Sequence, residues 1–167
     1  MVRFKFFGFG SSEKATPVVS PKAVVEEDPS LVEGPQENIQ GKRVLIVDDD
    51  PVFLRATAMK LQSAGFQVRV ATESSEAIAA LSDQPVDAVL MDITFQPDVC
   101  NGGRGWWDGF QLMSWLRGNP AVKGARFIMV SNSGATADRQ RAQQLGFVAY
   151  LEKPLDHAQL FAAMRWD

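Results

Sequence analysis

The most constraining feature of this sequence is a short apolar run that leads directly into three carboxylates, VLIVDDD at residues 44–50. Four consecutive apolar residues without alternation predict a strand buried on both faces, as in a parallel sheet covered by helices. Sheets of this kind bind ligands at the carboxyl edge, where such a strand ends. At about 5 Å and an effective dielectric constant of about 20, each carboxylate pair repels by roughly 3 kcal/mol. Two interpretations stay open here: a cation binds among the carboxylates, or they form a solvated acidic turn that caps a helix beginning at Pro51.

Strand-like and helix-like segments alternate five times after residue 41. The expected strands are 43–47, 67–71, 87–92, 127–131 and 148–153, and the expected helices are 51–64, 74–81 (capped by Ser74 or Ser75), 108–117, 136–145 and 155–164. In the first helix the predicted apolar face holds Phe53, Ala56, Leu61 and Ala64. This alternation predicts an α/β fold with a parallel sheet wrapped on both faces.

Polar side chains stand at the ends of four of the five expected strands. They are Asp48 and Asp49, Asp92, Ser131 and Lys153. Because the carboxyl ends of parallel strands meet at one edge, these groups can converge on one pocket. Oxygen ligands without His or Cys favour Mg²⁺, Mn²⁺ or Ca²⁺. A carboxylate can form an acyl phosphate, which makes Asp92 the candidate nucleophile, and an ammonium and a hydroxyl can bind phosphoryl oxygens. The pattern therefore predicts a phosphoryl-transfer site.

Four segments of the chain, VLIVDDDP, DAVLMD, IMVSNSGA and VAYLEKP, occur in the order and spacing of a known family. Over residues 41–167 the chain resembles a response-regulator receiver domain of two-component signalling. The resemblance implies a flavodoxin-like sheet of five parallel strands in the order 2-1-3-4-5. It also implies a signalling module rather than an enzyme, one that at most catalyses its own phosphorylation and dephosphorylation.

The same resemblance implies a role for each acidic site residue. Asp92 would be the phosphoacceptor, receiving its phosphoryl group from a histidine kinase or a histidine phosphotransfer protein. Asp49 would bind Mg²⁺ (or Mn²⁺) directly, Asp48 would act through water, and the backbone carbonyl of Thr94 would supply another ligand.

A conformational switch is implied as well. Ser131 and Lys153 would bind the phosphoryl group, and Ser131 would move toward it. Tyr150 would then turn inward and remodel the face formed by the fourth helix, fifth strand and fifth helix, for an unknown downstream protein. Tyr150 could equally be an ordinary half-buried strand aromatic. The Lys153–Pro154 bond would be cis.

Two positions depart from the family pattern. The turn at Asp108 and Gly109 arrives late, after an insertion at 96–107 that contains Trp106 and Trp107. Adjacent Trp residues favour a lid or a partner-binding loop, although a tolerated surface insertion is the simpler alternative. Asn132 stands where the family usually has a small residue, which predicts slow dephosphorylation.

Residues 1–40 are predicted to form a mostly disordered tail ahead of the receiver domain at 41–167. The first ten residues, MVRFKFFGFG, could dock on a partner or a membrane surface, but an untethered terminus is preferred and membrane contact is not expected. A net charge of −3 without a basic stripe disfavours nucleic-acid binding. The single Cys100 fits a reducing, cytoplasmic compartment, and no apolar run approaches the length of a membrane span.

Two other functions compete with a phosphorylated receiver. One is a receiver-like scaffold that binds partners through the tail and the insertion without phosphorylation. The other is a dehalogenase-type phosphatase, which needs a second Asp where this chain has Thr94. A stand-alone receiver that acts through protein contacts is expected, because the sequence ends shortly after the last expected helix; the alternative is that the chain is part of a longer protein.

Overall fold

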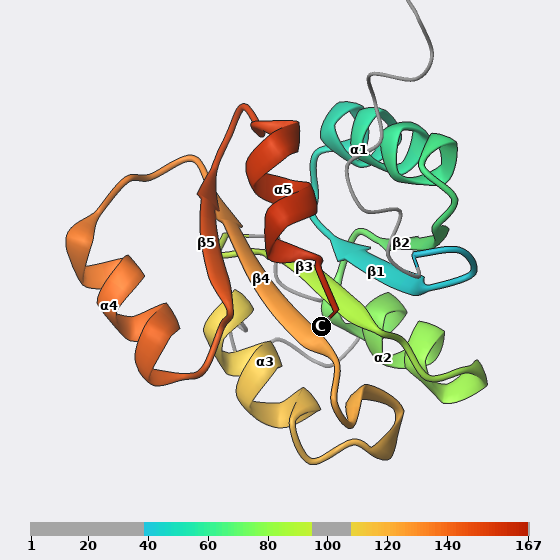
Figure 1. The fold of residues 1–167 in the computed structure, drawn as a ribbon. Coiled ribbons are helices and arrows are strands. Elements are labelled where there is room, and N and C mark those ends of the chain that lie inside the picture. Colours follow the sequence, from blue (N-terminus) through green and yellow to red (C-terminus); the bar gives the residue numbers. More distant parts are fainter. Residues whose placement is uncertain (1–38, 95–107, 167) are drawn as a thin grey trace, which may run out of the picture. The chain divides into compact units, whose positions relative to one another are not determined.

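The computed structural model describes residues 39–94 and 108–166, which form a five-stranded parallel sheet covered by helices (Figure 1). The strands are β1 (Arg43–Val47), β2 (Gln67–Ala71), β3 (Ala88–Asp92), β4 (Arg126–Ser131) and β5 (Ala149–Glu152). The helices are α1 (Pro51–Ser63), α2 (Ser74–Asp83), α3 (Gly109–Leu116), α4 (Thr136–Gln144), α5 (His157–Ala163) and the short 3-10 helix η3 (Pro120–Val122). The strand order β2-β1-β3-β4-β5 confirms the predicted flavodoxin-like fold.

Two hydrophobic cores lie on opposite faces of the sheet. Leu45, Val89 and Met129 pack with α2, α3 and α4, whereas alternate residues such as Ile46 and Leu90 pack with α1 and α5. Successive side chains of a strand point to opposite faces, so strands buried on both sides need a continuous apolar sequence. The absence of alternation in β1, β3 and β4 is therefore explained by the two helix layers.

The buried face of helix α1 matches the predicted one only in part, since Phe53, Leu61 and Ala64 contact the core as expected. Its buried residues are Leu54, Thr57 and Leu61, while Ala56 is exposed. Leu54 and Leu61 each bury far more apolar area than an alanine can, and their spacing of seven residues decides the rotation of the helix.

The N-cap of α2 and the start of α5 were predicted wrongly. Glu73, not Ser74 or Ser75, occupies the N-cap position of α2, and its side chain makes no capping hydrogen bond. Helix α5 begins at His157 because Asp156 accepts the backbone N–H groups of Ala158 and Gln159, two residues later than expected. A cap sets a helix start by satisfying free N–H groups, which hydrophobic spacing alone does not reveal.

The carboxyl ends of β1, β3, β4 and β5 lie along one edge of the sheet. Val47 pairs with Met91 and Asp92 pairs with Val130, so β1, β3 and β4 finish at similar levels. The Lys153–Pro154 peptide bond that follows β5 is cis, as the family resemblance implied. Within the described ranges, no helix is long and apolar enough to cross a membrane. The predicted tail up to residue 38 and the insertion with Trp106 and Trp107 lie outside the described residues.

Candidate functional site

The three carboxylates that follow β1 divide between two tasks. Asp50 is the N-cap of α1 and accepts the backbone N–H groups of Val52 at 2.8 Å and Phe53 at 3.2 Å. The backbone N–H of Asp50 in turn donates to Asp48 Oδ1 at 3.0 Å. Asp48 is fully buried and Asp49 is half-buried. The interpretation as a helix cap is therefore right for Asp50. The carboxylates of Asp48 and Asp49 do not cap α1 and can take part in a separate site.

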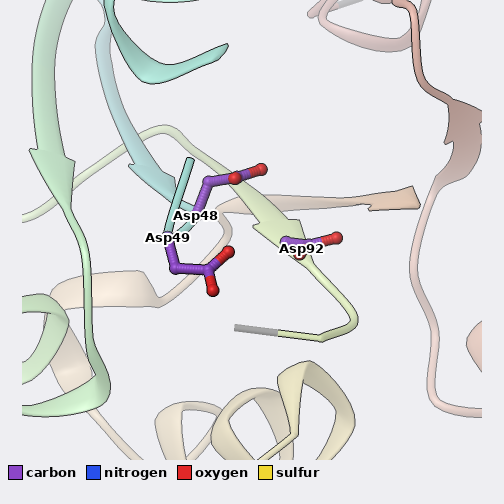
Figure 2. A group of neighbouring side chains, drawn as sticks. All are labelled: Asp48, Asp49 and Asp92. Atoms are coloured by element: carbon purple, nitrogen blue, oxygen red, sulfur yellow. The ribbon is translucent and has the colours of Figure 1, made fainter. Parts of the chain in front are cut away.

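Asp48, Asp49 and Asp92 come together at the ends of β1 and β3 (Figure 2). One carboxylate oxygen of each residue lies within 4.8 Å of the others. Among the residues described, Asp48 Oδ2 and Asp92 Oδ1 are buried without a hydrogen bond of acceptable geometry. Buried anionic oxygens are costly unless a charge or a ligand satisfies them, so this cluster needs positive charge.

Lys153 supplies part of that charge. Its Nζ lies 2.5 Å from Asp48 Oδ2 and 3.7 Å from Asp92 Oδ1, and its side chain is only 11% exposed. The same ammonium lies over the ring of Phe53, 4.4 Å from the ring centroid. One ammonium cannot neutralise three carboxylates, which leaves the pocket with net negative charge.

Burial dominates the protonation of the two innermost carboxyl groups. It raises the pKa of Asp92 from 3.8 to about 6; the ammonium of Lys153 opposes this rise, and the nearby Asp48 carboxylate adds to it. Burial also raises the pKa of Asp48, against the close ammonium of Lys153 and the backbone N–H of Asp50, which both lower it. Burial thus disfavours the ionised form of both carboxyl groups, and a bound cation would favour it.

The donor set fits a hard divalent cation such as Mg²⁺ or Mn²⁺. The cluster of Asp48, Asp49 and Asp92 offers only carboxylate oxygens, and two of these oxygens are buried without hydrogen bonds among the described residues. Thr94, whose backbone carbonyl was predicted as a further ligand, lies two residues beyond Asp92 in the bend that follows β3.

Ser131 and Tyr150 meet at the segment between β4 and α4. Ser131 is buried at the end of β4, and its Oγ accepts the backbone N–H of Ser133 at 3.0 Å. Tyr150 is half-buried in β5, and its hydroxyl donates to the backbone carbonyl of Ser133 at 2.5 Å. The guanidinium of Arg139 lies over the Tyr150 ring, 4.7 Å from its centroid. Both residues predicted to switch therefore contact one short segment.

Two contacts of the site were not predicted from the sequence. A side chain at Gly109 would place its Cβ 2.1 Å from the backbone carbonyl oxygen of Asp92, so the start of α3 packs directly against the pocket. The Asp108–Gly109 pair indicated a turn, but not this close approach. From the sequence, Phe53 was predicted only to lie on the apolar face of the first helix, and its contact with Lys153 was not predicted. The one feature of the sequence that could have indicated this contact is that Phe53 lies in the first turn after the acidic end of the strand. His157 lies exposed at the start of α5.

Comparisons with known proteins agree on one family. The sequence profile of the response regulator receiver domain matches residues 44–165. The chain is 30% identical over 125 residues to the transcriptional regulatory protein GltR of Pseudomonas aeruginosa, covering 75% of this chain and 48% of GltR. It is 31% identical over 152 residues to the acid tolerance regulatory protein ActR of Sinorhizobium medicae, covering 91% of this chain and 68% of ActR. The chain thus spans about half to two thirds of these relatives.

A solved structure gives the same fold. It is a response regulator of Burkholderia pseudomallei, described with a phosphorylated aspartic acid, a calcium ion and citrate. It superposes with a TM-score of 0.62 at 24% identity, over 74% of this chain and 66% of that one.

Proposed function

The chain belongs to the response regulator receiver family, and from that premise we propose that it accepts a phosphoryl group on Asp92 in a two-component relay. The donor is a histidine kinase or a histidine phosphotransfer protein. The observation that carries the proposal is the meeting of Asp48, Asp49, Asp92 and Lys153 at one edge of the sheet. Buried carboxylates next to an ammonium suit a site at which a negatively charged phosphoryl group is bound and later released.

The reaction is a transfer between two nucleophiles. A carboxylate oxygen of Asp92 forms the new O–P bond while the N–P bond of the phosphohistidine breaks. The electron pair of that bond stays on the imidazole nitrogen, and a proton on the other ring nitrogen lets the imidazole leave neutral. Asp92 must be ionised to attack, and the ammonium of Lys153, 3.7 Å from Asp92 Oδ1, favours that form.

Lys153 and Ser131 would then hold the transferred group. The ammonium offers a point charge and the hydroxyl one hydrogen bond to phosphoryl oxygens. Asp48, Asp49, Asp92 and the carbonyl of Thr94 would hold Mg²⁺ or Mn²⁺, which supplies positive charge for the same oxygens when bound. The calcium ion and phosphorylated aspartate described for the Burkholderia protein support this assignment.

The output of the proposed relay is a protein contact. Phosphorylation adds about −1.5 to −2 units of charge beside buried Ser131. Movement of Ser131 would remove its hydrogen bond with the Ser133 N–H, and Tyr150 is joined to the same residue through the Ser133 carbonyl. The altered α4-β5-α5 face would then bind a downstream protein. A cytoplasmic location and a domain boundary near residue 41 belong to the same proposal.

Intact-mass measurement tests this function directly. Incubation with acetyl phosphate and Mg²⁺ should add the mass of one phosphoryl group, and EDTA should prevent it. Asp92→Asn should remove the adduct. Asp50→Asn is the matched control, because Asn also caps α1 and Asp50 uses its carboxylate for capping. A folded parent protein that never gains the adduct would favour the scaffold alternative.

A further inference from the structure

The ammonium of Lys153 has an aromatic neighbour as well as its acidic ones. It lies 2.5 Å from Asp48 Oδ2, and 4.4 Å from the centroid of the Phe53 ring. Lys153 carries its charge on four flexible methylene groups, so the ion pair alone does not fix where its N–H donors point. With only 11% of the side chain exposed, contacts with protein atoms decide the position of the ammonium.

We propose that Phe53 is a positioning residue for Lys153, and that its ring holds the ammonium at the pocket for the incoming phosphoryl oxygens. This inference rests on the proposed phosphoacceptor function and adds a residue to it. In this role Phe53 acts on the phosphoryl group only through Lys153.

An aromatic ring suits this task better than a further carboxylate. The face of the ring attracts a cation, and the attraction grows when water is excluded. The ring adds no formal charge, so it leaves the positive charge of Lys153 available to a phosphoryl group. A carboxylate in the same place would neutralise that charge and add to the repulsion among Asp48, Asp49 and Asp92.

The local backbone holds both partners of Lys153 in place through one residue. The carboxylate of Asp50 accepts the Phe53 N–H at 3.2 Å, and the N–H of Asp50 donates to Asp48 Oδ1 at 3.0 Å. Phe53 is half-buried and packs against the core beneath α1 and α5. The junction between β1 and α1 therefore fixes an aromatic face and a carboxylate relative to each other, with the ammonium near both.

Substitutions that separate the charge distribution of the ring from its size test the inference. In the full chain, Phe53→Leu keeps an apolar side chain, whereas Phe53→Tyr keeps the aromatic face. Phe53 replaced by mono-, di- and trifluorophenylalanine keeps the shape and weakens the attraction for a cation stepwise. For each protein, the rate of adduct formation with acetyl phosphate and Mg²⁺ is measured by intact mass, and thermal unfolding is followed by circular dichroism.

We expect the Phe53→Leu rate to fall by about fivefold, with Phe53→Tyr close to the parent. The rate should decline steadily along the fluorinated series while the unfolding temperature stays constant. The NMR resonances of the Lys153 protons next to Nζ can be assigned by their disappearance in Lys153→Arg. In the parent they should be shifted upfield by the ring current of Phe53, and Phe53→Leu should remove this shift.

Equal rates across the fluorinated series, in proteins that all fold, would show that Phe53 only fills space and would overturn the inference. A parent protein that forms no adduct would instead refute the proposed function. In that case the presence or absence of the ring-current shift would still decide whether Phe53 holds the ammonium.

Discussion

Removing the charge of Asp92 should stabilise the metal-free protein at neutral pH. The carboxyl group is only 2% exposed, and its pKa rises from 3.8 to about 6, chiefly through burial. That shift corresponds to roughly 3 kcal/mol of folding free energy spent on keeping the group ionised. Asp92→Asn keeps the size of the side chain and removes this cost, so its free energy of unfolding should exceed that of the parent by an amount of this order.

The gain should depend on pH in a defined direction. Between about pH 4 and pH 6 the folded parent binds more protons at Asp92 than the unfolded chain, so its stability falls as pH rises through this window. Above about pH 6 both states are ionised at this residue and the loss is complete. The difference between Asp92→Asn and the parent should therefore grow from about pH 4 to pH 6 and then stay level.

Urea unfolding in EDTA, followed by circular dichroism across this pH range, measures the difference. Asp87→Asn is a control of opposite sign: burial works against ionisation of Asp87, but its hydrogen bonds with the Arg43 N–H and Lys42 prevail and lower its pKa. Its contribution is present at neutral pH and lost under acid, so this variant should be less stable than the parent at neutral pH. Saturating Mg²⁺ should shrink the advantage of Asp92→Asn by stabilising the parent. The reasoning would be refuted if Asp92→Asn were less stable than the parent at neutral pH in EDTA. It would also be refuted if the difference in free energy of unfolding between the two proteins did not change with pH.

Three further substitutions test other parts of the account. Gly109→Ala should cost about 2 kcal/mol or more by urea unfolding, because its Cβ would lie 2.1 Å from the Asp92 carbonyl oxygen; Gly118→Ala, whose nearest contact would be 3.7 Å, should be tolerated, and equal stabilities would contradict this. Asp50→Ala should destabilise the protein by about 1 kcal/mol through loss of the α1 cap, and Asp50→Asn should not; similar losses in both would argue against capping. Asn132→Ala should shorten the lifetime of the acyl phosphate, measured as loss of the mass adduct, since Asn132 is expected to narrow access to it; an unchanged lifetime refutes that expectation.

Strands β1, β3 and β4 could be predicted closely because their apolar runs are unbroken, and β2 because its apolar residues alternate. The expected bounds of β1 and β2 match the structure, and those of β3 and β4 differ by one residue at one end. The carboxyl edge followed from the same logic, since Asp48, Asp49, Asp92 and Lys153 stand at strand ends that a parallel sheet must bring together.

What the sequence could not provide were contacts that depend on how helices sit over the sheet. The rotation of α1 was set by Leu54 and Leu61, and it places Phe53 over Lys153 rather than fully in the core. The close packing of Gly109 on Asp92 depends on where α3 begins in space, which no local pattern encodes. That Asp50 caps α1 while Asp48 and Asp49 belong to the site could likewise be seen only from the hydrogen bonds of the cap.

Localising the phosphoryl group tests the central claim most directly. Borohydride reduces an aspartyl phosphate to homoserine, so the parent protein is treated with acetyl phosphate and Mg²⁺, reduced, digested and analysed by peptide mass. The account predicts homoserine at position 92 and at no other aspartate, and none when EDTA is present. Homoserine at Asp48 or Asp49, or an unmodified Asp92 in a protein that has gained the adduct, would contradict it.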